Sequence, residues 1–188
     1  LGDVYKRQNI YCLNGEDGSL LWNFTAEDNV GTAPALGDVD GDGKLEVIVG
    51  SRDNNIYCLN GEDGSLLWKY TTGHFIWSSP ALSDVDGDGG LEVIVGSLDG
   101  NIYCLAGENG VLQWNYTTGG VVDSSPAIGD VDQDGILEVI IGGEDYYIYC
   151  LNGEDGSLLW RYATSAGIYS SPALGDVDWD GALEVIIG

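Results

Sequence analysis

Polar and apolar residues alternate in short runs along this chain, and these runs predict β-strands. Within residues 78–118, the segments SSPALSDV, LEVIVGS, NIYCL and VLQWNYTT are separated by residues rich in Gly, Asp and Asn. LEVIVGS is rich in β-branched residues, and the last two segments alternate with the period of two that a strand requires. Pro80 stands near the start of the first segment, where a strand tolerates proline. We name the four predicted strands a, b, c and d in chain order.

The same pattern recurs with a fixed period of 46 residues, marked by Asp38, Asp84, Asp130 and Asp176. Asp-Gly turns between alternating strands indicate antiparallel hairpins, and four such strands per repeat are typical of a β-propeller blade. We therefore expect an all-β fold: a β-propeller fragment of four 46-residue repeats, each a four-stranded antiparallel blade. The expected units are a partial blade at 9–31, blades at 32–77, 78–123 and 124–169, and a partial blade at 170–188.

The first eight residues depart from the repeat. In register they should match VIVG followed by SRDN, but the chain reads LGDVYKRQ. The stretch DVYKRQ resembles the translation of a sequencing-library adaptor, so residues 1–8 are expected to be a non-native scar. At the other end Gly188 corresponds to Gly50, after which strand c follows, and the chain is expected to stop in mid-repeat.

The link between strands a and b is an acidic loop. In DVDGDGKLE, which begins at Asp38, acids stand at positions 1, 3, 5 and 9, and Gly43 stands at position 6, where a sharp turn needs a positive φ. Two like charges about 4 Å apart repel by roughly 4 kcal/mol at an effective dielectric of about 20, so these carboxylates need a cation. Alternating oxygen ligands suit Ca²⁺, whereas Mg²⁺ prefers smaller octahedral sites. Position 12 lacks the Glu that closes an EF-hand loop, so the Glu at position 9 should close this one.

One Ca²⁺ per repeat is thus predicted in a structural role. Four equal copies offer no distinguished centre, so catalysis at any one of them is not expected. The predicted ligands are Asp38, Asp40, Asp42 and Glu46; Asp84, Asp86, Asp88 and Glu92; Asp130, Asp132, Asp134 and Glu138; and Asp176, Asp178, Asp180 and Glu184.

Two known repeat families resemble these motifs. Asp-x-Asp-x-Asp-Gly-x-x-Glu followed by VIVG resembles the FG-GAP (VCBS-type) repeat, the Ca²⁺-binding blade of integrin α-chain propellers. NIYCLNGEDGSLLW is similar to the PQQ-like propeller repeat of quinoproteins and related scaffold proteins. Together the resemblances cover residues 9–188 and imply the propeller fold and the carboxylate ligands above. Glu at position 9, where integrin blades commonly have Asp, is a departure that leaves the denticity open.

Composition narrows the partners and the compartment. The formal charge is -25 and only 6 residues are Lys or Arg, so binding to nucleic acid or anionic lipid is not expected. No apolar run approaches the ~20 residues of a membrane helix, so no membrane insertion is expected. Extracellular Ca²⁺ modules bind with a Kd of roughly 10⁻⁴ to 10⁻³ M, which favours a secreted, extracellular or cell-surface protein.

The cysteines and the single histidine indicate no catalytic group. Cys12, Cys58, Cys104 and Cys150 occupy equivalent positions on neighbouring sheets, which should lie at least about 10 Å apart. A disulfide needs a Cα separation below ~7 Å, so all four are predicted to be free and buried. His74 is the only histidine, and no Ser/His or Cys/His pair repeats.

The loops at the two ends of the predicted blades differ in uniformity. The a-to-b loops keep every acid, and the c-to-d turn reads NGEDG three times and AGENG once. The d-to-a links AEDNVGT, TTGHFIWSS, TTGGVVDSS and ATSAGIYSS vary, as do SRDN, SLDG and GEDY between b and c. Drift in unconstrained loops is one explanation, and an asymmetric ligand surface is the other. The ligand-face candidates are His74, Phe75, Trp77, Asp123, Tyr146 and Tyr169.

Three functional classes fit these observations. The expected one is a calcium-stabilised, non-enzymatic propeller module for adhesion or for recognition of a protein or glycan ligand. One alternative is a fragment of a PQQ-dependent quinoprotein dehydrogenase, which would need an asymmetric cofactor pocket and usually a vicinal Cys pair. The other is a fragment of a calcium-dependent polysaccharide lyase with its acids and bases in other blades. The near-identity of the copies favours the first, because an active site normally breaks symmetry.

Overall fold

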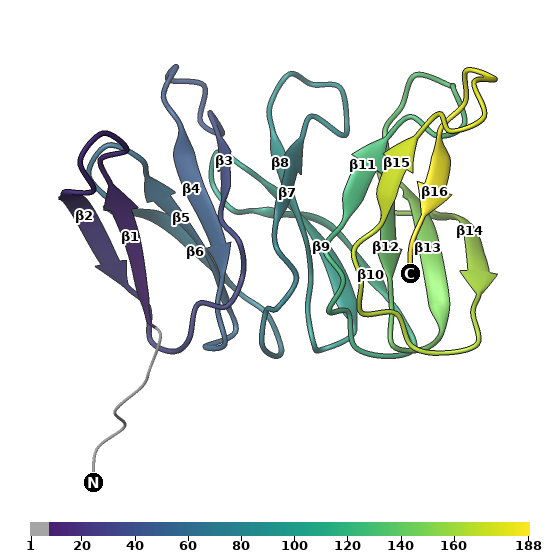
Figure 1. Cartoon of the computed structure of the whole chain (residues 1–188), viewed down its shortest axis with the longest axis horizontal. Helices are drawn as coiled ribbons and strands as arrows, with labels where there is room; N and C mark the ends of the chain where they lie inside the picture. The colour runs from purple at the N-terminus through teal and green to yellow at the C-terminus, as the bar shows by residue number, and fades with distance from the viewer. Residues whose placement is uncertain (1–7) are drawn as a thin grey trace, which may run out of the picture.

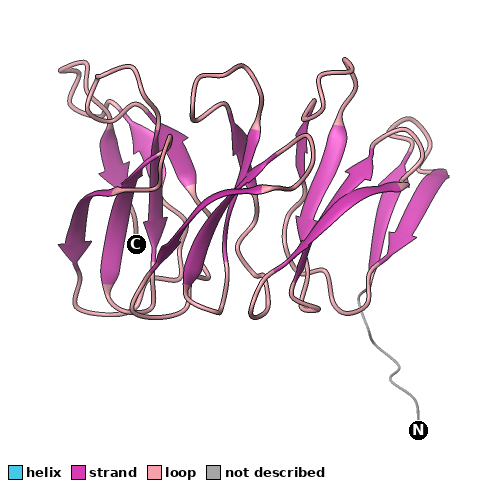
Figure 2. Cartoon of the chain, turned by 180° about the vertical axis from the view of Figure 1, so that it is seen from behind, coloured by secondary structure: helices cyan, strands magenta, loops and turns pink. Residues whose placement is uncertain are grey.

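The computed structural model describes residues 8–188 and shows a row of antiparallel sheets in chain order (Figures 1 and 2). Most of the expected adaptor-derived segment, residues 1–7, lies outside the described residues. Two-stranded sheets begin and end the row, and three four-stranded sheets lie between them. The expected all-β fold of repeated four-stranded antiparallel blades is confirmed. Within the described part, no helix is long and apolar enough to cross a membrane.

The strands pair with their neighbours in sequence. The first two-stranded sheet contains β1 (Asn9–Leu13) and β2 (Leu20–Thr25), and the last contains β15 (Ala173–Gly175) and β16 (Glu184–Ile186). The three complete blades contain β3 (Ala35–Gly37), β4 (Glu46–Gly50), β5 (Asn55–Asn60) and β6 (Leu66–Thr71); β7 (Ala81–Ser83), β8 (Glu92–Gly96), β9 (Asn101–Ala106) and β10 (Leu112–Thr117); and β11 (Ala127–Gly129), β12 (Glu138–Gly142), β13 (Tyr147–Asn152) and β14 (Leu158–Ala163).

The first strand of each blade is shorter than its sequence suggests. In the second complete blade, only Ala81–Ser83 of SSPALSDV pairs with β8. Pro80 has no N–H to donate, so the strand starts after it. At the other end the Val85 N–H donates to Oε2 of Glu92 at 3.0 Å instead of to the sheet. The acidic loop therefore takes over the end of the predicted strand.

The cores lie between neighbouring blades, because both faces of the central strands are apolar. On β9, Ile102 and Cys104 pack with Val139 of the following blade, whereas Tyr103 and Leu105 pack against the preceding blade. The β8, β9, β12 and β13 strands are buried over almost all of their length. Each blade therefore depends on its neighbours for its core.

A repeated tryptophan joins neighbouring sheets at three of their four junctions. The indole N–H of Trp68 donates to the carbonyl of Gly107 at 2.7 Å. A Cβ added to Gly110, in the same turn, would lie 2.6 Å from the Trp68 ring, so the turn packs directly on the indole. Trp22 bonds Gly61 at 2.8 Å and Trp114 bonds Gly153 at 2.7 Å in the same way. The tryptophans at these three positions therefore pack between neighbouring sheets.

The cysteines lie in these interblade cores. All four are free, as predicted, and Cys58, Cys104 and Cys150 are buried, whereas Cys12 is only half-buried. Cys12 belongs to β1, in the first two-stranded sheet. Burial raises the pKa of the Cys58 and Cys150 thiols to about 12, and the nearby Glu46 and Glu138 carboxylates add to the effect. These thiols are therefore apolar core groups and poor nucleophiles.

Candidate metal loops and the opposite face

The acidic loops fold around the aspartate at position 1. Oδ1 of Asp38 accepts the N–H of Gly41 at 2.9 Å, and Oδ2 accepts the N–H of Gly43 at 3.0 Å. Gly43 has a φ of 88°, which confirms the expected turn at position 6. The a-to-b loops lie at one end of the blades, at the top of Figure 1. The loop backbone therefore turns its carboxylates toward one another at this end.

Each loop gathers three carboxylates that could hold a metal ion. In the first and fourth loops they come from positions 1, 3 and 5, and in the second and third from positions 1, 3 and 9. The ligand atoms of each group lie within 4.8 Å of one another. No loop brings all four predicted ligands into one group. The groups are Asp38, Asp40 and Asp42; Asp84, Asp86 and Glu92; Asp130, Asp132 and Glu138; and Asp176, Asp178 and Asp180.

The glutamate at position 9 has a backbone role that its place in the loop sequence does not predict. Oε2 of Glu138 accepts the N–H of Val131, at position 2, at 2.8 Å, and the other three loops repeat this bond. Oε1 of Glu138 is buried and has no hydrogen-bond partner within residues 8–188. The same is true of Oδ1 of Asp130 and of Asp176. Buried carboxylate oxygens without donors are the atoms that a cation would satisfy.

The electrostatics of the loops also favour a cation. The pKa of Glu92 is raised to about 7, mainly by burial and also by the negative charges of Asp86, Asp88 and Asp84, against the opposing bond from Val85. The pKa values of Glu46 and Glu138 are raised for the same reasons. Hard carboxylate oxygens prefer hard divalent cations such as Ca²⁺ and Mg²⁺. The residues present therefore fit a divalent metal ion.

Position 4 of the loop carries a constraint that was also missed. Gly41 and Gly87 have positive φ there, but so do Gln133 and Trp179, each at 65°. A side chain in this left-handed region costs roughly 1–2 kcal/mol. The signal was present in the sequence, since DGDG occurs in two of the four copies. The third and fourth loops thus adopt a glycine conformation without glycine.

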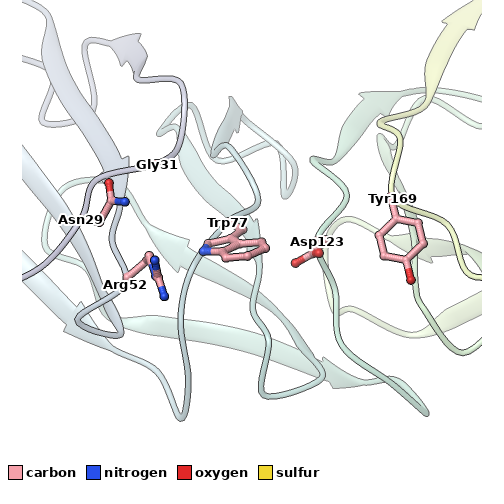
Figure 3. Close-up of a pocket in the computed structure, with 6 residues that line it drawn as sticks. All are labelled: Asn29, Gly31, Arg52, Trp77, Asp123 and Tyr169. Carbon is pink, nitrogen blue, oxygen red and sulfur yellow. The ribbon is translucent and has the colours of Figure 1, made fainter. Parts of the chain in front are cut away.

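The opposite end of the blades contains a pocket of about 340 Å³ (Figure 3). Three of the six predicted ligand-face residues, Trp77, Asp123 and Tyr169, meet in it. Its lining residues are Asn29, Gly31, Arg52, Trp77, Asp123 and Tyr169. All of them belong to b-to-c or d-to-a links, so this pocket lies at the end away from the acidic loops.

The other three candidates are not lining residues of the pocket. Phe75 packs against one of the lining residues, with the guanidinium carbon of Arg52 5.0 Å from its ring centre. Nδ1 of His74 accepts the N–H of Phe75 at 2.9 Å, and the two rings lie side by side. Tyr146 is exposed and has a φ of 73°. Arg52 was not predicted, because one basic residue in SRDN stands out only when the fold places it beside Trp77.

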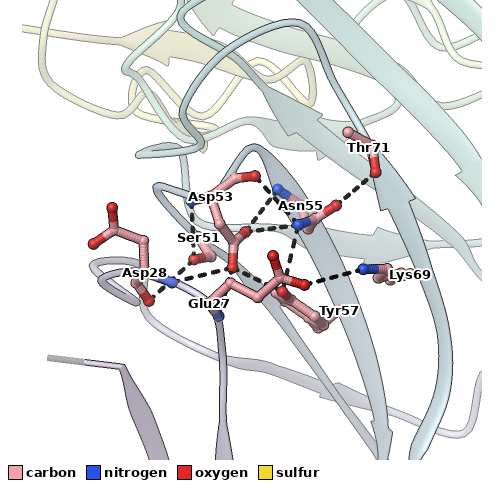
Figure 4. A network of polar contacts seen from close by, with 8 residues as sticks. All are labelled: Glu27, Asp28, Ser51, Asp53, Asn55, Tyr57, Lys69 and Thr71. Carbon is pink, nitrogen blue, oxygen red and sulfur yellow. Dashed lines mark hydrogen bonds and ion pairs between the residues drawn. The ribbon is translucent and has the colours of Figure 1, made fainter. Parts of the chain in front are cut away.

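A repeated Asp–Tyr bond also holds this end together (Figure 4). The Tyr57 hydroxyl donates to Oδ2 of Asp53 at 2.7 Å, and the N–H of Glu27, from the preceding link, donates to the same oxygen at 2.9 Å. Burial raises the pKa of Asp53, but these bonds and those from Asn55 outweigh burial and lower it. The b-to-c links were predicted to vary from copy to copy, but one aspartate in each of them is constant. The missed signal is the 46-residue spacing of Asp53, Asp99 and Asp145, which all accept such a bond.

The chain resembles propellers of several kinds in solved structures. It is similar to BamB from Moraxella catarrhalis, with 23% identity and a TM-score of 0.67 over 85% of this chain and 45% of that one. It is also similar to the V. cholerae biofilm matrix protein Bap1, with 24% identity and a TM-score of 0.75 over 98% of this chain and 29% of that one. Quinohemoprotein alcohol dehydrogenase from Comamonas testosteroni gives 15% identity and a TM-score of 0.73 over 97% and 37%. The chain thus spans less than half of each of these proteins, and the likeness establishes the fold.

Two family matches divide the sequence. A search of curated proteins finds no match to the chain. Residues 130–187 match the FG-GAP-like repeat, and residues 6–131 match the family described as outer membrane protein assembly factor BamB. Both resemblances inferred from the motifs are confirmed. Because the second match covers more than half of the sequence, the chain belongs to the PQQ-like repeat family described as outer membrane protein assembly factor BamB.

Proposed function

We propose that this chain is a calcium-stabilised, extracytoplasmic β-propeller module that acts as a non-enzymatic scaffold for adhesion or for recognition of a protein or glycan. The observation that carries the proposal is the fourfold acidic group at one end of the blades. In the third loop it includes a buried glutamate oxygen without a donor. The opposite end, which repeats less strictly, supplies the surface for a partner.

Calcium suits the loops better than magnesium does. Mg²⁺ demands near-ideal octahedral geometry and keeps several waters, whereas Ca²⁺ accepts six to eight oxygens in irregular arrangements. The groups differ in composition between loops, with position 5 in two and position 9 in the others, which favours the more tolerant ion. Bound calcium would supply positive charge among carboxylates that otherwise repel. The loop residues themselves hold strands a and b together through the Glu–Val bonds.

The compartment follows from the affinity expected of such loops. Extracellular calcium modules have a Kd of roughly 10⁻⁴ to 10⁻³ M, so they fill only where calcium is millimolar. One similar structure is a biofilm matrix protein, and the family is described by an outer membrane protein assembly factor. Both descriptions support a place outside the cytoplasm, with secretion or cell-surface display as the proposal for this chain.

The absence of a distinguished centre among the loops supports the non-enzymatic role. The four acidic groups occupy equivalent positions, and each consists of carboxylates alone. His74, the only histidine, accepts a backbone N–H from Phe75. Similarity to the quinohemoprotein dehydrogenase, at 15% identity, concerns the fold. A scaffold that presents a binding face is therefore the function that these residues support best.

Calorimetry with and without calcium tests the proposal. When free calcium is tenfold above Kd, each site adds about 1.4 kcal/mol, so four sites add about 6 kcal/mol to the free energy of unfolding. The melting temperature of the chain should rise markedly in millimolar CaCl₂ relative to EGTA, and rise less in equal MgCl₂. An unchanged melting temperature in calcium would rule out the proposed stabilisation.

A further inference from the structure

Four residues that line the pocket in Figure 3 occupy the same position in successive repeats, but each is a different type of residue. Gly31, Trp77, Asp123 and Tyr169 follow one another at 46-residue spacing, and all four line the cavity. One position thus presents a bare backbone, an indole, a carboxylate and a phenol in successive repeats. Uniform repeats would make a symmetric surface, whereas this one has a different chemical group on each side.

Three polar atoms of the lining residues have no hydrogen-bond partner in the described chain. They are Oδ1 of Asn29, Nε of Arg52 and Oδ1 of Asp123, and all three are buried. Each such atom costs roughly 1–3 kcal/mol when it is left unpaired. Two of them accept and one donates, so the missing partner must both donate and accept hydrogen bonds. Water and the hydroxyl groups of a ligand both have this property.

Arg52 is held in place without a carboxylate partner. Its guanidinium carbon lies 5.0 Å from the ring centre of Phe75 and 5.8 Å from that of Trp77. The two ion pairs of residues 8–188 involve Lys44 and Lys69 instead. Stacking on the rings orients the guanidinium and leaves Nε free to donate. Arg52 therefore makes no salt bridge within residues 8–188, and its Nε–H can donate a hydrogen bond to a ligand.

Aromatic surface completes the pocket. Trp77 is 47% exposed and Tyr169 is 65% exposed, although both are large and partly apolar. In Figure 3 the indole and the phenol lie on either side of Asp123. A ligand with an apolar ring face and polar edges would cover the aromatics and reach the unpaired atoms at the same time.

The charge of the chain and the position of the pocket argue against two other classes of ligand, polyanions and peptides that add to a sheet. The chain has a net charge of -25, and Arg52 is the single basic residue in the lining, so a polyanion would be repelled. A peptide that adds to a sheet needs an exposed strand edge, but every lining residue belongs to a link between strands. The cavity volume of about 340 Å³ is near the lower end of small-ligand pockets, which span about 300–1,000 Å³.

We propose that this pocket binds an uncharged saccharide, with a sugar ring against Trp77 and hydroxyl groups paired with Asn29, Arg52 and Asp123. The inference rests on the proposed function, because it names the ligand class of the recognition face. The sugar hydroxyls donate to the two oxygens and accept from the guanidinium N–H. The acidic loops at the other end take no part in this contact.

Calorimetric titration of the calcium-loaded chain with cellotetraose, maltotetraose and mannotetraose tests the inference. Alginate and a basic decapeptide serve as probes of the competing ligand classes. The variants are Trp77→Ala and the nearly isosteric Asp123→Asn, and Trp179→Ala, an exposed tryptophan in the fourth acidic loop, is the matched control. At least one tetrasaccharide should bind, each pocket variant should weaken it by about tenfold or more, and the control should leave it unchanged.

Three results would overturn the inference. They are no binding of any of the three tetrasaccharides, equal binding to parent and pocket variants, or displacement of the sugar by alginate or the peptide at the same pocket. Melting curves of every variant in calcium show whether the pocket changes leave the fold intact. If calcium stabilises the chain but no sugar binds, only the ligand class is wrong. If calcium does not stabilise it, the proposed function fails whatever the titrations show.

Discussion

The two ends of these blades share one backbone plan but relate to the repeat in opposite ways. At the acidic-loop end every copy keeps the carboxylates, the Glu–Val bond and, at three interfaces, the Trp–Gly bond between blades. At the other end the Asp–Tyr bond repeats, while the residues that line the pocket differ from copy to copy. The comparison shows that one end of the blades can repeat all its stabilising contacts, while the other combines a repeated stabilising bond with side chains that vary from copy to copy.

Among single substitutions, the largest expected effect comes from loss of the tryptophan bond between blades. Trp114 is buried, and its indole N–H donates to Gly153 at 2.7 Å. Trp114→Ala should lower the free energy of unfolding by about 3–5 kcal/mol, because it opens a cavity and leaves the carbonyl unpaired. Trp160, its equivalent, is 40% exposed, so Trp160→Ala should cost about 1 kcal/mol. Equal losses in urea unfolding of the two variants would show that the interblade bond is not what matters.

The second prediction concerns the acidic loop of Glu138, where one substitution should have opposite effects on the free energy of unfolding with and without calcium. Glu138→Gln keeps an oxygen for the Val131 N–H but removes the buried charge. In calcium this variant should lose about 1.4 kcal/mol of stability, which is the contribution of one site when free calcium is tenfold above Kd. In EGTA it should instead stabilise the chain, because burial and three neighbouring aspartates already raise the pKa of Glu138. Glu154→Gln, at an exposed position in the adjacent turn, should change the stability in neither buffer. Melting curves in calcium and in EGTA measure both variants, and an effect of Glu138→Gln with the same sign in both buffers would contradict the prediction.

The third effect tests the bond that repeats at the pocket end. Tyr103→Phe removes the donor to Oδ2 of Asp99 at 2.8 Å and should cost about 1.5 kcal/mol at neutral pH. Burial raises the pKa of Asp99, but bonds from Tyr103, Asn101 and Gly73 outweigh it and lower the pKa. A carboxylate whose pKa is lowered by folding stabilises the folded protein above the pKa of the unfolded state, near 3.9. This stabilisation is lost as the pH falls through the pKa of the folded state.

The gap between Tyr103→Phe and the parent should therefore narrow below about pH 4. Urea titrations at neutral and acid pH measure it. Tyr146→Phe, which removes the hydroxyl of an exposed tyrosine in the next b-to-c link, is the matched control and should show no pH-dependent gap. A constant difference across this range would mean that the charge of Asp99 does not contribute.

The smallest effect concerns backbone strain in the acidic loops. Trp179 is 89% exposed and has a φ of 65°, so Trp179→Gly should stabilise the chain by about 1 kcal/mol. The reciprocal change Gly87→Ala, at the same loop position with a φ of 75°, should destabilise by a similar amount. Melting curves in calcium compare them. Stabilisation by both changes, or by neither, would remove strain as the explanation.

Much of the fold could be predicted from short-range patterns. The period-two alternation in NIYCL placed Tyr103 and Cys104 on opposite faces, and the structure buries both between blades. The acidic loops were predictable because their spacing is local and repeats four times. Which three carboxylates converge in each loop was not predictable, since the Glu–Val bond is the same in all four loops and the difference depends on the path of the backbone.

The sequence by itself determined the repeat, the strand order and the acidic loops, because these depend on residues that are neighbours in the chain or exactly one period apart. Only the tertiary structure placed Arg52 beside the rings of Phe75 and Trp77, and gathered Trp77, Asp123 and Tyr169 around one cavity. Those contacts join different blades through variable links. Their geometry depends on how the blades pack, and interblade packing is a property of the whole row that no single repeat encodes.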